Sequence, residues 1–183
     1  YTIPTAGNVQ AAIAYGQNRW TVVRQLRYLQ TRPDIVLMLN GLPIITLELK
    51  NQLSCQNVDC AARHYKTDRH PKDLLYMPKR CAAHFAVDDA EVKMCTALAG
   101  PKSWFLPFNR GVDDGAGNPA VEGKLKTAYL WEDILQKERL SDILENYAQV
   151  IREKDAETGK FKEKCIWPRY HQLEAVRALL ADT

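Results

Sequence analysis

The dipeptide Asn40-Gly41, set between two apolar runs, constrains the fold of this chain more than any other feature. Residues 34–39 are mostly aliphatic, and residues 43–50 are again rich in β-branched and aliphatic side chains. Asn-Gly favours a tight turn because both residues accept positive φ angles. The segment therefore predicts a β-hairpin, and the period-2 pattern of residues 20–28 predicts a strand that precedes it.

Three charged side chains lie at the open end of this predicted hairpin. Glu48 and Lys50 share one face of a strand because successive side chains alternate, whereas Leu47 and Leu49 are expected to point into a core. Asp34 opens the preceding strand, so we expect it to lie near them. Two carboxylates brought together repel each other unless a cation compensates them, and the pattern therefore indicates a metal site.

Mg²⁺ suits such a site because it prefers carboxylate and carbonyl oxygens and keeps several waters. We expect Asp34, Glu48 and the backbone carbonyl of Leu49 to be its ligands. Lys50 would orient an attacking water and offset the charge that develops on a phosphate. These residue types favour phosphodiester hydrolysis and a solvated charged face about equally.

The acid-x-lysine pattern alone decides nothing, because two rivals occur in the same chain. Glu122-Gly123-Lys124 lies among glycines and a proline, which is typical of a loop. Glu91-Val92-Lys93 is the closer rival, since residues 84–87 and 92–95 could form a hairpin around Asp88-Asp89. Its acidic residues lie in the turn, however, and no separate carboxylate opens an apolar strand.

Further motifs follow one another in order along nearly the whole chain. They are RQLRY at 24–28, YKTDR at 65–69, HFAVD at 84–88, FLPFNRG at 105–111, GAGNP at 115–119, YLWE at 129–132 and PRYHQL at 168–173. Together with the predicted hairpin, they resemble the nuclease domain of the restriction (motor) subunit of type I restriction-modification enzymes. That domain belongs to the PD-(D/E)xK nucleases.

The resemblance implies an α/β (α+β) fold with a restriction-endonuclease-like core, a mixed central β-sheet flanked by helices and a C-terminal helical segment. It implies that Asp34, Glu48 and Lys50 are the catalytic residues of a type I site-specific deoxyribonuclease and that Mg²⁺ is the cofactor. The substrate would be double-stranded DNA, cut without reading of sequence at the cut site. Cutting would be coupled to an ATP-driven translocase in the same polypeptide, with methylation and specificity subunits as partners.

Basic side chains near the hairpin are candidates for contacts with DNA phosphates. We expect these from Arg24, Arg27, Lys66 and Arg69, although a solvated face is an equal alternative for each. His64 stands where the resemblance leads us to expect glutamine, and we favour an ordinary surface or core role for it over a catalytic one.

The C-terminal motif resembles the sequence that leads into superfamily 2 helicase motors. By this resemblance Gln172 would contact the adenine of ATP in the full-length protein, with an ordinary helix-surface residue as the alternative. The sequence contains no G-x-x-x-x-G-K-[ST] phosphate-binding loop, so we do not expect this chain to hydrolyse ATP.

The sequence divides into three predicted sections. These are a nuclease domain at 1–123, a helical segment and charged linker at 124–164, and the start of a helicase/translocase domain at 165–183. Within them we expect a helix at 57–69, strands at 84–87 and 92–97, a helix at 133–147, and a mobile linker at 152–164. Family members usually carry a further upstream stretch, so the chain is expected to be a fragment.

Composition adds little. Lys and Arg number 25 against 22 Asp and Glu, a net charge of +3 that permits DNA binding without indicating it. The 5 cysteines are scattered and lack C-x-x-C spacing, so reduced thiols in the cytoplasm are the simplest account. We expect no signal peptide and no membrane span.

Two functions from different classes stay open at this point. The first is an active Mg²⁺-dependent endonuclease domain. The alternative is a catalytically impaired structural or docking fragment that serves the motor and partner subunits. In either case we expect the isolated chain to cut DNA weakly or not at all.

Overall fold

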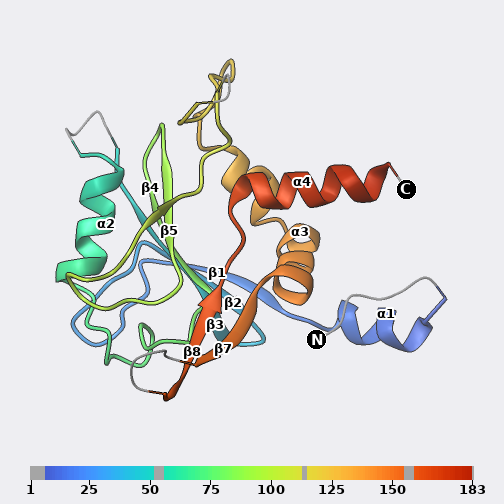
Figure 1. Ribbon diagram of the computed structural model, residues 1–183, viewed down its shortest axis with the longest axis horizontal. Coiled ribbons are helices and arrows are strands. Elements are labelled where there is room, and N and C mark those ends of the chain that lie inside the picture. Colours follow the sequence, from blue (N-terminus) through green and yellow to red (C-terminus); the bar gives the residue numbers. More distant parts are fainter. Residues whose placement is uncertain (1–6, 52–55, 113–114, 155–158, 183) are drawn as a thin grey trace.

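In the described part of the chain, six strands form one mixed sheet at the centre of the molecule (Figure 1). The computed structural model describes residues 7–51, 56–112, 115–154 and 159–182. The strands lie side by side in chain order, as β1 Trp20–Arg24, β2 Ile35–Leu39, β3 Leu42–Leu49, β4 Ala83–Val87, β5 Val92–Cys95 and β6 Leu106–Pro107. Neighbouring strands are antiparallel except for β3 and β4, which are parallel. The predicted fold, a mixed sheet flanked by helices with a helical C-terminal segment, is confirmed.

The predicted hairpin forms between β2 and β3. Asn40 and Gly41 turn the chain with φ angles of 52° and 82°, as a two-residue turn of this kind requires. Strand β1 pairs with β2 and ends at Arg24, earlier than residue 28, because Gln25 takes a φ of 52° that no strand accommodates.

A crossover helix, α2 (Val58–Thr67), joins the parallel strands β3 and β4. The helix begins after Asn57, whose side chain accepts a hydrogen bond from the backbone N–H of Cys60 at 3.2 Å. Its buried side chains face the sheet and are Val58, Ala61, Ala62 and Tyr65. The predicted helix is therefore confirmed, with its end at Thr67.

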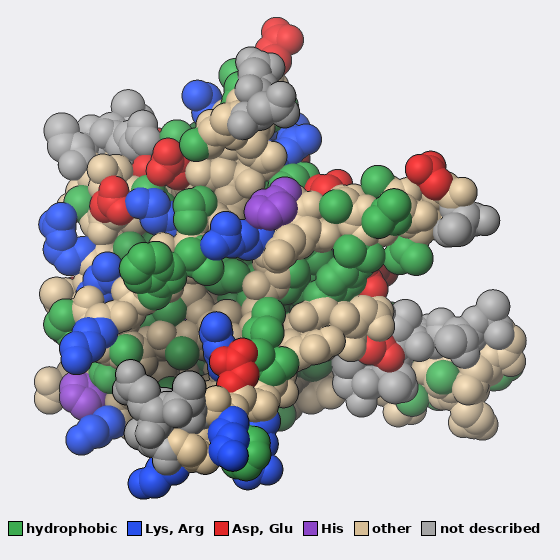
Figure 2. Space-filling view, viewed as in Figure 1, with side chains coloured by type: hydrophobic (Ala, Val, Ile, Leu, Met, Phe, Trp, Pro, Cys, Tyr) green, Lys and Arg blue, Asp and Glu red, His purple; other side chains and the backbone are tan. Residues whose placement is uncertain are grey.

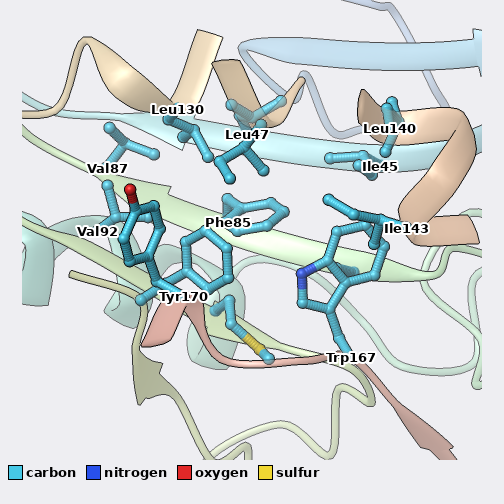
Figure 3. Packing of buried hydrophobic residues seen from close by; sticks show 14 of the residues in the cluster. Ile45, Leu47, Phe85, Val87, Val92, Leu130, Leu140, Ile143, Trp167 and Tyr170 are labelled. Atoms are coloured by element: carbon cyan, nitrogen blue, oxygen red, sulfur yellow. The ribbon is translucent and has the colours of Figure 1, made fainter. Parts of the chain in front are cut away.

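Side chains along β3 and β4 point alternately to the two faces of the sheet, and each face packs against a different layer. Ile45, Leu47 and Phe85 belong to the main hydrophobic core, on the face away from α2 (Figure 3). The opposite face carries Thr46 and Glu48, toward α2. The sheet thus has one face that packs into the apolar core and one face where buried polar side chains meet a helix.

C-terminal helical segments cover the apolar face. They are η2 Leu130–Ile134 and η3 Ile143–Tyr147, both π-helical, with α3 Lys137–Asp142 and α4 Tyr170–Ala181. The ring of Phe85 packs edge-on against Trp167 at 6.0 Å (Figure 3). The helical structure predicted at 133–147 is confirmed, although it is interrupted at residues 135–136.

The charged segment predicted to be a mobile linker instead contributes a second, two-stranded sheet. Strand β7 (Gln149–Lys154) pairs antiparallel with β8 (Phe161–Ile166), while residues 155–158 of the predicted linker lie outside the described residues. The predicted linker therefore contains strand residues at 152–154 and 161–164, and its role as a linker stays a prediction. Trp167 and Leu173 lie in the main core, and the division into three domains stays a prediction.

The described N-terminal part begins with helix α1 (Val9–Gly16), which extends away from the sheet (Figure 1). The hydroxyl of Tyr15 donates a hydrogen bond to Ser141 Oγ at 3.0 Å, joining α1 to α3. No helix within the described ranges is both long and apolar enough to cross a bilayer.

Candidate functional site

The open end of the β2–β3 hairpin brings the three predicted catalytic residues together. The strand register pairs Ile35 with Leu47, so Asp34 and Glu48 face each other one step further along. Lys50 follows immediately after β3. Asp34 raises the pKa of Glu48 and Lys50 lowers it, as expected of charges in one cluster.

Asp34 is held in place through both of its carboxylate oxygens. Oδ2 accepts a hydrogen bond from the backbone N–H of Leu49 at 2.8 Å, and Oδ1 accepts one from Gln25 Nε2 at 2.6 Å. The backbone N–H of Gln25 also donates to the Asp34 carbonyl at 2.8 Å. The left-handed turn at Gln25 therefore fixes Asp34 relative to the end of β3.

Glu48 is a buried carboxylate with a buried cation beside it. Its exposure is 1 %; its Oε1 accepts a hydrogen bond from Arg69 Nε at 2.8 Å and forms an ion pair with Arg69 Nη2 at 2.7 Å. Burial raises the pKa of Glu48 from 4.5 to about 7, even though Arg69 opposes the shift. At neutral pH burial therefore disfavours the ionised form of Glu48 more than Arg69 favours it.

His64 of α2 faces the free oxygen of Glu48. Its Nδ1 lies 3.8 Å from Glu48 Oε2, and its Nε2 lies 4.0 Å from Asp68 Oδ2. Burial lowers the pKa of His64, and Lys50 lowers it further, so the ring is neutral at pH 7. Half-exposed beside the carboxylates, His64 belongs to the site geometrically, which its residue type alone did not indicate.

A buried polar group that the sequence motifs do not reveal lies on the same face of β3 as Glu48. Thr46 Oγ1 lies 2.8 Å from the hydroxyl of Tyr65 and 2.7 Å from His84 Nδ1, linking β3 to both α2 and β4. Burial lowers the pKa of His84 to about 3, so its ring is uncharged when it forms the hydrogen bond with Thr46. Thr46 precedes Glu48 by two residues, so alternation along the strand places both on one face. This spacing is the sequence feature from which the buried group could have been predicted.

Replacing Thr46 by valine is expected to lower the free energy of unfolding by about 2 kcal/mol, because Tyr65 and His84 would lose a partner in the interior. Urea denaturation measures the change. Thr21→Val, on the partly exposed strand β1, is the matched control and should change it by less than about 0.5 kcal/mol. Equal losses in the two variants would contradict the role of this group.

A family model for the type I restriction enzyme R protein N terminus matches residues 6–103, more than half of the chain. The chain belongs to this family. No curated protein matches it. The matched residues include the hairpin, α2, β4 and β5, so every residue of the cluster around Glu48 lies inside the family match.

The four basic residues predicted to contact DNA lie in three different environments in this R protein N terminus. Arg24 and Arg27 are exposed at and after the end of β1. Lys66 is half-buried and lines a hollow beside Trp104. Arg69 is 8 % exposed and bound to Glu48, so in this structure its guanidinium pairs with a buried carboxylate and does not lie on an open surface.

Gln172 lies outside the family match, at the start of α4. Its Oε1 accepts a hydrogen bond from the backbone N–H of Arg169 at 2.9 Å. The side chain therefore caps its own helix here, and the predicted contact with ATP stays a prediction.

The cluster fits the ion that the resemblance implies. Among the described residues no group of three His, Cys, Asp or Glu side chains could hold a metal, but Mg²⁺ usually takes one or two carboxylates and waters. Each oxygen of Asp34 keeps a second lone pair, and Glu48 Oε2 faces His64 beyond hydrogen-bonding distance. A raised pKa marks Glu48 as a carboxylate that a further cation would stabilise.

Leu49 departs in part from its prediction. Its side chain is 40 % exposed, so the expectation that it points into a core was wrong; β3 ends here, at the edge of the packed layers. The N–H and C=O of a strand residue point toward the same neighbouring strand. Because the Leu49 N–H points to Asp34, its carbonyl is directed toward the same edge, as a metal ligand there would need to be.

Proposed function

We propose that this chain is the Mg²⁺-dependent endonuclease domain of a type I restriction enzyme R subunit and hydrolyses phosphodiester bonds of double-stranded DNA. The observation that carries the proposal is the convergence of Asp34 and Glu48 at one end of the hairpin, with Lys50 beside them. A buried carboxylate whose pKa is raised to about 7 is costly to the fold, as perturbed groups at functional sites often are.

Each residue has a distinct part in the proposed chemistry. Asp34, Glu48 and the Leu49 carbonyl would hold the ion, which when bound supplies Lewis acidity toward a phosphoryl oxygen and an acidified water. Lys50 would orient the attacking water and stabilise negative charge on the phosphate. Arg69 holds one oxygen of Glu48, and the other oxygen, Oε2, faces His64.

We extend the proposal from the family to the assembled enzyme. Cutting would need no sequence reading at the cut site and would be coupled to ATP-driven translocation, with methylation and specificity subunits as partners in the cytoplasm. Membership of a restriction enzyme family supports this extension. On this view the isolated chain cuts DNA weakly or not at all.

A plasmid assay tests the proposal. We expect the assembled complex, given Mg²⁺ and ATP, to cut plasmid DNA, and we expect Asp34→Ala and Lys50→Ala to abolish cutting while translocation continues. The matched control is Glu122→Ala with Lys124→Ala, which alters the same tripeptide pattern at an exposed position. Cutting retained by Asp34→Ala would refute the site, and robust ATP-independent cutting by the isolated chain would refute the coupling.

The docking alternative is favoured by one observation. Arg69 already supplies a positive charge to Glu48, so the fold does not depend on a metal to compensate that carboxylate. Calorimetric titration with Mg²⁺ separates the two functions, because a docking fragment would not bind the ion at Asp34 and Glu48. Assembly with the partner subunits, without cutting, would then be its remaining activity.

A further inference from the structure

Trp104 is 75 % exposed, although an indole is among the largest apolar side chains. Its backbone is firmly held. Ser103, which precedes it, is buried, and its Oγ accepts a hydrogen bond from the backbone N–H of Ala99 at 2.8 Å and donates one to the Gly100 carbonyl at 2.7 Å. Phe105, which follows it, points inward. The indole is thus presented to solvent by an anchored segment.

Phe105 anchors the other side of Trp104. Its ring stacks on that of Tyr65 at 5.5 Å between centroids, with 30° between the ring planes. Tyr65 is itself completely buried on α2. Buried Ser103 and inward-pointing Phe105 flank Trp104 on either side in sequence, so the indole is directed outward from a segment held at both ends.

Basic side chains surround this indole. Trp104 lines two hollows, one of about 580 Å³ between β5 and β8 and one of about 200 Å³ beside α2. A third of about 390 Å³ shares Arg169 with the first and Lys93 with the second. Figure 2 looks onto a face where Lys and Arg side chains gather around a hollow.

Positive charge predominates on this surface. Among the described residues that line the three hollows, five are Lys or Arg and two are Asp or Glu. The five basic residues are Lys66, Lys93, Arg110, Lys164 and Arg169. One of them, Lys93, is paired with Asp59 at 2.5 Å. The excess of positive charge favours an anionic partner.

This surface is separate from the cluster around Glu48. Lys66 follows His64 by two residues on α2, which places them about 200° apart around the helix. His64 faces Glu48, whereas Lys66 faces Trp104. Residues of the helix between these two directions are buried against the sheet, so α2 separates the two surfaces.

An exposed indole with surrounding cations has the chemistry of a single-strand binding surface. The face of an aromatic ring stacks on an unpaired base, and Lys and Arg neutralise the neighbouring phosphates. Bases within a duplex are already stacked on one another, so an indole cannot reach their faces. We propose that Trp104, the four basic residues that line its two hollows and Arg110 of the adjoining third hollow bind single-stranded nucleic acid. This function lies beyond the proposed cleavage of duplex DNA and does not depend on it.

Fluorescence anisotropy of a labelled oligothymidylate of about 16 nucleotides tests the proposal in EDTA, where no cutting can occur. We expect Trp104→Ala to weaken binding about tenfold and Trp104→Tyr to weaken it less. Trp131→Ala is the matched control, because that indole is 41 % exposed on η2, and it should leave binding unchanged. Circular dichroism checks that each variant is folded.

Salt dependence tests the cationic part. Lys164→Glu with Arg169→Glu is expected to weaken binding and to lower the slope of log Kd against log salt by about 0.7 for each phosphate that the variant no longer neutralises. A duplex of the same length should compete poorly. The proposal is overturned if Trp104→Ala binds like the unaltered chain, if Trp131→Ala weakens binding as much, or if no oligonucleotide binds at low salt, which would point to a protein partner. Because metal and cleavage play no part, these failures are distinct from failure of the nuclease site.

Discussion

Replacing Arg69 by alanine is expected to lower the free energy of unfolding by about 3–5 kcal/mol at pH 8. Glu48 is 1 % exposed and is bound to the guanidinium through one hydrogen bond and an ion pair, so removal of Arg69 leaves a buried carboxylate without its cation. Urea denaturation at pH 8 measures the loss. At pH 5 the loss should be smaller by about 1 kcal/mol, because a Glu48 whose pKa is raised to about 7 is ionised at pH 8 and protonated at pH 5.

Arg139→Ala is the matched control. Arg139 is as buried as Arg69, at 8 %, and it pairs with Glu174 at 2.6 Å. Glu174 is 41 % exposed, so water can solvate the carboxylate that remains, and the loss should be about 1–2 kcal/mol without the pH dependence. Adding Glu48→Gln to Arg69→Ala should restore much of the stability. A loss for Arg69→Ala that is equal at pH 5 and pH 8 would contradict this account.

Local sequence predicts those parts of the site that depend on backbone conformation. Asn40-Gly41 sets the turn, and the turn fixes which residues of β2 and β3 are opposite each other. Alternation then places Glu48 on one face, and Asn57 marks the start of α2. These features come from steric preferences of a few neighbouring residues, which a single sequence contains.

The partners of Glu48 are not predictable in the same way. Arg69 lies 21 residues from Glu48 and follows α2, so only the packing of the helix on the sheet brings the two together. In sequence it is one basic residue among several, and its residue type predicts a DNA contact no less than an ion pair. Lys66, three residues earlier, faces the other side of α2, which is equally invisible in the sequence.

The β7–β8 hairpin was missed because its strands bury almost nothing. Nearly all of its side chains are exposed, and charged residues stand on both of its faces. Without a buried face there is no period-2 apolar pattern, and such a composition is typical of a linker. Main-chain pairing forms these strands, and hydropathy does not reveal main-chain pairing.

Replacing Glu48 by glutamine is expected to remove most of the pH dependence of stability between pH 4.5 and pH 7. In the unaltered protein burial raises the pKa of Glu48 from 4.5 to about 7, so the fold favours the protonated acid. The stability contributed by that preference is complete below pH 4.5 and is lost as the pH rises through 7, a change of about 3 kcal/mol. Thermal or urea unfolding from pH 4.5 to pH 8 should follow this slope, and Glu48→Gln should flatten it.

The same substitution links stability to the proposed metal site. Above pH 7 the ionised Glu48 is destabilising, and a divalent ion held with Asp34 would offset that cost. Mg²⁺ should therefore raise the melting temperature of the unaltered chain at pH 8, raise it less at pH 5, and leave Glu48→Gln unchanged at either pH. Glu91→Gln, outside the cluster, should respond to Mg²⁺ as the unaltered chain does. A Mg²⁺ effect that persists in Glu48→Gln would mean that the ion binds elsewhere and that Glu48 is not one of its ligands.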